Sequence, residues 1–149
     1  MRNTVKLGPS LFGLLPFAVG GLMNWAIMER PDSVLPFPEI AIILLVCWGL
    51  LAYSMRAKFT RKQLLCSMHL IPAVILVLVA VQILVFQAYW RNPVGLWTQL
   101  YYLPVMNLGF FLAFWVPSML GAYVASFLLM LGSAWLGIKA REKQGGCMG

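Results

Sequence analysis

Charged side chains are scarce in this sequence: only 10% of its 149 residues are Asp, Glu, Lys or Arg. Soluble domains typically contain about 25%. Hydrophobic residues make up 62% of the chain and fall into long uninterrupted runs. The composition therefore excludes a water-soluble globule and predicts an integral membrane protein embedded in a lipid bilayer.

Cysteine and histidine are also rare, with three cysteines and the single histidine His69. No CxxC pair is present, so the cysteines are expected to be free thiols rather than a disulfide framework. Cys66 and His69 lie three residues apart, but a zinc site normally takes three or four protein ligands. We therefore expect no metal and no cofactor, and we interpret His69 as an interfacial polar residue at a helix start.

The motifs of common enzymes are missing, including a phosphate-binding glycine loop, HExxH and GxSxG. No acidic or basic residue lies in the middle of an apolar run, which argues against a proton-coupled antiporter. We expect no catalytic residues. The enzymatic alternative is a lipid-modifying protein with His69 as the base and Cys66 as the nucleophile.

Four apolar segments are long enough to cross the membrane, since about 20 residues span a hydrocarbon core of about 30 Å. They cover about residues 7–28, 39–55, 64–89 and 105–138. The first is expected to be a retained crossing, because no small-x-small cleavage site follows it. The predicted fold is an all-α integral membrane protein, with residues 1–149 forming one four-helix transmembrane domain of two hairpins.

The fourth segment is too long for a simple crossing, because a helix over 105–138 would measure about 51 Å. Pro117 lies inside it and should kink or break a helix. Two alternatives remain open. The favoured one is a single long helix kinked at Pro117. The other is an interfacial or re-entrant helix over 96–115, followed by a crossing from about Trp115.

The basic residues predict the orientation. The net charge of +7 does not indicate nucleic acid, because the positive residues lie between apolar runs rather than on one face. By the positive-inside rule, both termini are cytoplasmic in a multi-pass protein of a bacterial plasma membrane. Nine of the eleven Lys and Arg residues fall on one side: Arg2, Lys6, Arg56, Lys58, Arg61, Lys62, Lys139, Arg141 and Lys143. The run of Arg56, Lys58, Arg61 and Lys62 is also a candidate site for anionic lipid headgroups.

Four amides fall in the outer half of the predicted bilayer: Asn24, Gln82, Gln87 and Asn107. An unpartnered amide in hydrocarbon costs several kcal/mol. These side chains should therefore face one another, a cavity or a partner. One interpretation is interhelical hydrogen bonding, and the other is a polar pocket open to the outside.

Aromatic residues crowd the same outer rim, most densely in AYWRNPVGLWTQLYYLP, residues 88–104. Trp and Tyr favour the headgroup level, so an aromatic belt is the simpler explanation. A surface for a ligand or partner protein is the alternative. Its candidate residues are Arg91, Trp97, Tyr101 and Tyr102, together with the four amides.

Small residues recur at helical spacing in the last segment: Gly121, Ala125, Ser126, Ser133 and Gly137. This spacing lets two helix backbones approach closely. The expected partner is another helix of the same chain. A helix of another subunit or of a second copy is the alternative.

The stretch SVLPFPEIAIILLVCWGLLAYSMRAK, residues 33–58, resembles the proline-led second helix of small four-helix subunits in substrate-binding-protein-dependent carboxylate transporters. That resemblance implies a transport accessory subunit. We therefore predict a non-enzymatic membrane protein that serves as an accessory or structural subunit of a transport-related complex. The first alternative is a self-sufficient transporter or channel with an outward-facing pocket, and the second is the lipid-modifying enzyme.

Overall fold

The computed structural model describes residues 7–32, 34–87, 93–116 and 118–146, and every regular element within them is helical. The elements are α1 (Leu7–Phe12), α2 (Leu15–Glu29), α3 (Phe37–Met55), α4 (Arg61–Val81), the π-helical turn η1 (Gln82–Phe86), α5 (Pro93–Leu112) and α6 (Met119–Gly146). Four stretches are long and apolar enough to cross a membrane: Pro9–Glu29, Phe37–Met55, Arg61–Phe86 and Met119–Gln144. An all-helical chain with four candidate membrane spans was predicted, and both features are present.

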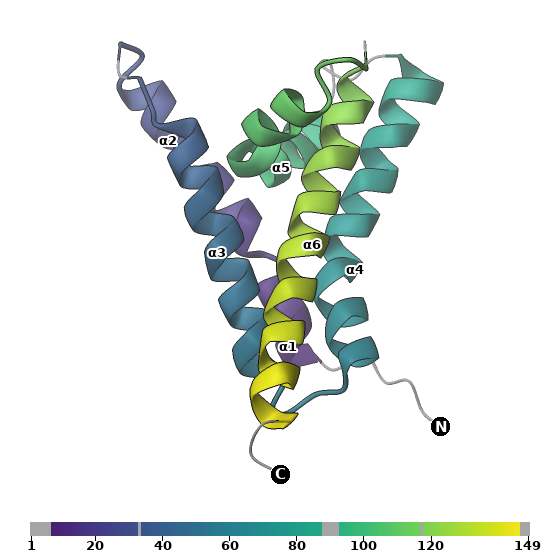
Figure 1. The fold of residues 1–149 in the computed structure, drawn as a ribbon. Helices are drawn as coiled ribbons and strands as arrows, with labels where there is room; N and C mark the ends of the chain where they lie inside the picture. The colour runs from purple at the N-terminus through teal and green to yellow at the C-terminus, as the bar shows by residue number, and fades with distance from the viewer. Residues whose placement is uncertain (1–6, 33, 88–92, 117, 147–149) are drawn as a thin grey trace.

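Helices α2 and α3 lie on one side of the molecule and α4 and α6 on the other, and the two pairs diverge toward one end (Figure 1). Helix α5 lies between them in the diverging half and contacts α2, α3, α4 and α6. The opposite end holds α1, the turn between α3 and α4, and the C-terminal end of α6. The interior next to α5 is therefore occupied by protein side chains.

The favoured interpretation of residues 105–138 as one long helix is wrong. Helix α5 ends at Leu112 and α6 begins at Met119. Between them, the Val116 N–H bonds to the Ala113 carbonyl at 2.9 Å, which is a turn rather than a helical continuation. Ser118 then caps α6, because its Oγ accepts a hydrogen bond from the Leu120 N–H at 3.2 Å. Pro117 lies outside the described residues, but a proline there has no N–H to continue α5.

A second break divides the first predicted crossing. The N–H groups of Gly13 and Leu14 bond three residues back, to Ser10 and Leu11, so the chain tightens between α1 and α2. Pro16 follows within the first turn of α2, where its missing N–H is tolerated. The span Pro9–Glu29 is therefore one membrane-length segment with a break near one end.

Helices approach most closely where glycines face backbone. A Cβ on Gly137 of α6 would overlap the Gly49 carbonyl of α3, and one on Gly20 of α2 would overlap the Leu100 carbonyl of α5. A Cβ on Gly109 of α5 would likewise overlap the Ala122 carbonyl of α6. Because no side chain separates these backbones, α5 packs directly between α2 and α6.

Candidate functional site

Two adjacent tyrosines fix α5 within the bundle. The Tyr101 hydroxyl donates to the Gly13 carbonyl at 2.8 Å, in the break between α1 and α2. The Tyr102 hydroxyl donates to the Pro72 carbonyl of α4, also at 2.8 Å. Both side chains are buried, and this burial raises the pKa of each hydroxyl, so both remain protonated donors. These predicted ligand-binding residues are thus engaged with the protein's own backbone.

Gln82 is the first residue of η1 and is buried, with 4% of its surface exposed. Among the residues that the structure describes, its carbonyl oxygen Oε1 has no hydrogen-bond partner. Short π-helical turns within α-helices occur frequently at functional sites. Gln82 is therefore a predicted site residue that keeps unused hydrogen-bonding capacity in the interior.

The other predicted outer-half residues are placed differently. Gln87 is exposed and adopts a left-handed backbone conformation with φ of 47°, and Asn107 is exposed on α5. Asn24 is half-buried on α2, and Arg91 lies outside the described residues. Gln82 is buried, whereas Gln87 and Asn107 are exposed, so the predicted amides differ in their surroundings.

Trp97, another candidate ligand or partner residue, lies on α5 with 56% of its surface exposed. Its ring stacks on Phe17 of α2, with 5.1 Å between the ring centroids. Part of this predicted aromatic surface therefore packs between two helices of the chain.

His69 is buried among the helices of the bundle. Only 6% of its surface is exposed, and its ring packs edge-on against Trp48 of α3 and Phe127 of α6. The ring atom Nδ1 lies 3.0 Å from the Leu65 carbonyl oxygen. Cys66 is exposed. One member of the Cys66/His69 pair thus faces inward and the other outward, which does not assemble a base and a nucleophile.

Three of the predicted helix-packing residues lie at contacts within the chain. Ser126 of α6 donates to the Ala122 carbonyl at 2.8 Å and approaches the Val105 carbonyl of α5 at 3.4 Å. Ser133 donates to the Leu45 carbonyl of α3, and Gly137 packs on α3 as described above.

The other two predicted packing residues have different surroundings. Gly121 faces the Val116 side chain in the turn that precedes α6. Ala125 is half-buried and lines an apolar groove between α3 and α6.

Three phenylalanines are exposed at the C-terminal end of α5 and just beyond it. Phe110, Phe111 and Phe114 are 44%, 74% and 79% exposed. We call these three residues the α5 phenylalanine patch. The chain between α5 and α6 lies at the end of the molecule where α6 begins (Figure 1).

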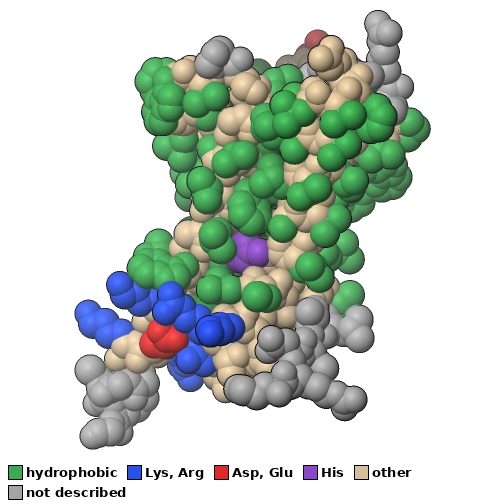
Figure 2. Space-filling model, turned by 90° about the vertical axis from the view of Figure 1, so that its right-hand side faces the viewer, with side chains coloured by type: hydrophobic (Ala, Val, Ile, Leu, Met, Phe, Trp, Pro, Cys, Tyr) green, Lys and Arg blue, Asp and Glu red, His purple; other side chains and the backbone are tan. Residues whose placement is uncertain are grey.

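Lys and Arg side chains gather at the other end of the molecule, below a face covered with apolar side chains (Figure 2). Arg56 is already engaged there, because its Nε lies 3.0 Å from Glu142 Oε1. The remaining predicted lipid-headgroup residues, Lys58, Arg61 and Lys62, are exposed. Tyr53 joins α3 to α6 by bonding to Gln144 and accepting a hydrogen bond from Arg141.

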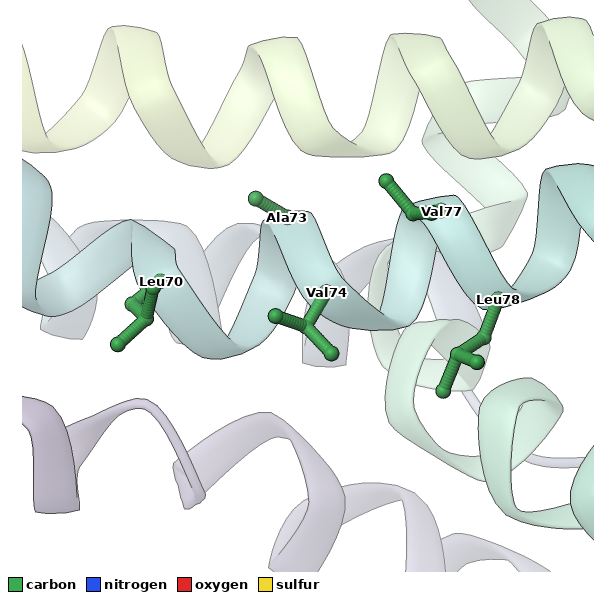
Figure 3. Close-up of a pocket in the computed structure, with 5 residues that line it drawn as sticks. All are labelled: Leu70, Ala73, Val74, Val77 and Leu78. Atoms are coloured by element: carbon green, nitrogen blue, oxygen red, sulfur yellow. The ribbon is translucent and has the colours of Figure 1, made fainter.

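In the described part of the chain, apolar hollows on the outside of the bundle include two that were not predicted from the sequence. The smaller, of about 260 Å³, runs along α4 and is lined by Leu70, Ala73, Val74, Val77 and Leu78 (Figure 3). The larger, of about 610 Å³, lies between α3 and α6. The larger hollow could have been predicted from the sequence. Ala125 and Gly132 lie seven residues apart, so two small residues fall on one face of α6 and leave room there.

No family model matches this chain, and no curated protein or solved structure is significantly similar to it. Within the part of the chain that the structure describes, no group of three His, Cys, Asp or Glu side chains is placed to hold a metal ion. Functional inference therefore rests on the geometry of the chain itself.

Proposed function

We propose that this protein is a non-enzymatic, multi-pass membrane protein that acts as an accessory subunit of a transport-related membrane complex. The α5 phenylalanine patch carries the proposal. Its three side chains are purely apolar, and two of them are more than 70% exposed. Aromatic residues are enriched in the cores of protein interfaces. The proposed partner is a membrane protein that offers an apolar surface at the same depth.

The occupied interior supports a structural role over a transport pathway. Helix α5 fills the space between the diverging helices, and the hydroxyls of Tyr101 and Tyr102 bond to backbone carbonyls. A carrier needs polar groups that exchange their partners with a substrate. A helix fixed by internal hydrogen bonds instead offers a rigid platform for another protein.

The proposed orientation places the basic end of the bundle in the bacterial cytoplasm. Arg56, Lys58, Arg61 and Lys62 lie at that end of the chain's four spans, as does the C-terminal end of α6. The positive-inside rule then puts the α5 phenylalanine patch in the outer half of the plasma membrane.

Photo-crosslinking tests the proposal. A benzoylphenylalanine at position 114 should give a crosslinked product with a second membrane protein in native membranes. The same probe at Leu84, which is 66% exposed on η1, is the matched control. The double change Phe111→Ala and Phe114→Ala should abolish co-purification in mild detergent without lowering the melting temperature of the isolated chain. A protein that always purifies as a lone monomer, with no crosslink at 114, would contradict the proposal.

A self-sufficient channel is the second candidate, and one observation favours it. The Gln82 amide is buried at the first residue of the π-helical turn, and its carbonyl oxygen has no hydrogen-bond partner among the described residues. In that case Gln82→Leu should abolish the swelling of proteoliposomes in a solution of a small neutral polyol, whereas the exposed Gln87→Leu should not. Proteoliposomes that swell no faster than empty vesicles would remove this candidate.

A further inference from the structure

The larger apolar groove, between α3 and α6, is open to the outside at Gly132. Large side chains stand beside it, with Leu128 55% exposed and Leu136 61% exposed. A Cβ added to Gly132 would meet no atom within 4 Å, so this glycine is not required by packing within the chain. The groove is lined by Leu45, Leu112, Trp115, Ala125, Leu128, Leu129, Gly132, Ser133 and Leu136.

The face of α6 that lines the groove continues into two lysines. Ala125, Gly132, Leu136, Lys139 and Lys143 follow one another at spacings of seven, four, three and four residues, which places them on one face of the helix. Both lysines are exposed. One helix face therefore passes from an apolar groove to positive charge within two turns.

Other charges at this end are arranged away from that face. The only acidic residue in the α6 sequence, Glu142, pairs with Arg56 of α3 at 3.0 Å. Arg141 donates to the Tyr53 hydroxyl at 3.2 Å, also toward α3. The Lys139 ammonium lies 4.6 Å from the centre of the Trp135 ring, an amphipathic pairing suited to the headgroup level.

We propose that this face binds one anionic phospholipid, with an acyl chain in the groove and the phosphate on Lys139 and Lys143. From Ala125 to Leu136 the groove rises about 16 Å along the helix axis. That matches half of a hydrocarbon core of about 30 Å, which is the depth of one leaflet. The apolar length and the paired positive charges at one end complement the two parts of such a lipid. This site lies on α6, beside the Arg56–Glu142 pair that joins α6 to the basic run between α3 and α4.

Native mass spectrometry of the full chain tests the site. The protein is released from nanodiscs that contain equal amounts of phosphatidylglycerol and phosphatidylcholine, and the lipids that stay bound are counted. The unaltered protein should retain phosphatidylglycerol preferentially. Lys139→Gln with Lys143→Gln should weaken that retention roughly 30-fold, since each lysine near anionic lipid contributes about fivefold. Arg141→Gln removes a positive charge of α6 that is directed to Tyr53 of α3, and it should have little effect.

Filling the groove gives a second, independent readout. Gly132→Leu should displace the bound lipid, whereas Gly21→Leu should not, because a Cβ on Gly21 also meets nothing within 4 Å but lies on α2. Lys139 and Lys143 lie beyond the groove, so their substitution does not change its packing. The lysine variants therefore still test the site if Gly132→Leu does not fold.

Three results would overturn the proposal. One is equal retention of both lipids by the unaltered protein, and another is unchanged retention in the lysine variants. The third is a Gly132→Leu protein that keeps its lipid but changes from a dimer to a monomer, which would assign the groove to a second copy of the chain.

Discussion

At the scale of single residues, polar side chains inside this bundle bond chiefly to backbone carbonyls. Tyr101 and Tyr102 donate to Gly13 and Pro72, and Ser126 and Ser133 donate to carbonyls of α6 and α3. A carbonyl oxygen has two lone pairs, so it can accept a hydroxyl in addition to its helical N–H. These hydroxyl groups therefore have hydrogen-bond acceptors in an apolar environment without bonding to one another.

The two adjacent glycines of α2 give a matched test of helix packing. A Cβ at position 20 would overlap the backbone of Leu100, whereas one at position 21 would meet nothing within 4 Å. Gly20→Ala should therefore lower the free energy of unfolding by about 1–3 kcal/mol, because α2 must move away from α5. Gly21→Ala should be neutral or stabilise by up to about 1 kcal/mol through helix propensity. Thermal unfolding in detergent measures both, and equal melting temperatures would mean that α2 and α5 do not touch as described.

Residue patterns anticipated some of these contacts and missed others. Small residues at helical spacing in α6 led to Ser126, Ser133 and Gly137, because that spacing is a local property of one helix. Gly20 and Gly109 were missed, since their role depends on which helix crosses them. The burial of Gln82 and the exposure of Asn107 were not predicted, because tertiary packing decides which side of each helix is covered.

At the scale of elements, α5 is where sequence reasoning was least informative. Its 20 residues have the length of a crossing, yet it does not qualify as one of the four candidate membrane spans. Helix α5 is inserted in the bundle because it contacts four other helices. These contacts join residues far apart in the sequence, so no local sequence pattern indicates them. The start of α4, in contrast, could have been predicted from the local sequence. Thr60 and Gln63 form a capping box, a four-residue pattern that marks the beginning of a helix.

Labelling of single cysteines tests whether α5 crosses the membrane. The turn η1 ends and α6 begins at the same end of the molecule (Figure 1), so the chain on both sides of α5 should be reached from one side. In a protein without its native cysteines, Gln87→Cys and Phe114→Cys should both react with an impermeant maleimide added outside cells. Lys58→Cys should react only after the cells are opened. Labelling of Gln87→Cys and Phe114→Cys from opposite sides would show that α5 is a crossing.

At the scale of the whole molecule, charge and apolar surface are separated along the long axis. The described basic residues gather mainly at one end, and apolar side chains cover the rest of the face that Figure 2 shows. Composition and charge position predicted this polarity, because both depend on the order of residues rather than on how the helices pack. A separate helix over 96–115 was one of two alternatives from the sequence, and α5 (Pro93–Leu112) corresponds to it, but its contacts with four other helices arise only when the spans are assembled.

Reporter fusions at the two ends of the spans test the orientation of the assembled molecule. Nine of the eleven Lys and Arg residues lie on the side that the positive-inside rule assigns to the cytoplasm. Alkaline phosphatase, which is active only after export, should therefore be active when fused after Asp32, between α2 and α3, and inactive when fused after Gly146. Green fluorescent protein should give the reverse pattern, because it fluoresces when it folds in the cytoplasm. Replacing Arg56, Lys58, Arg61 and Lys62 together by Gln should weaken this preference and yield a mixed population. An active phosphatase after Gly146 in the unaltered chain would invert the orientation and would move the α5 phenylalanine patch to the cytoplasmic side.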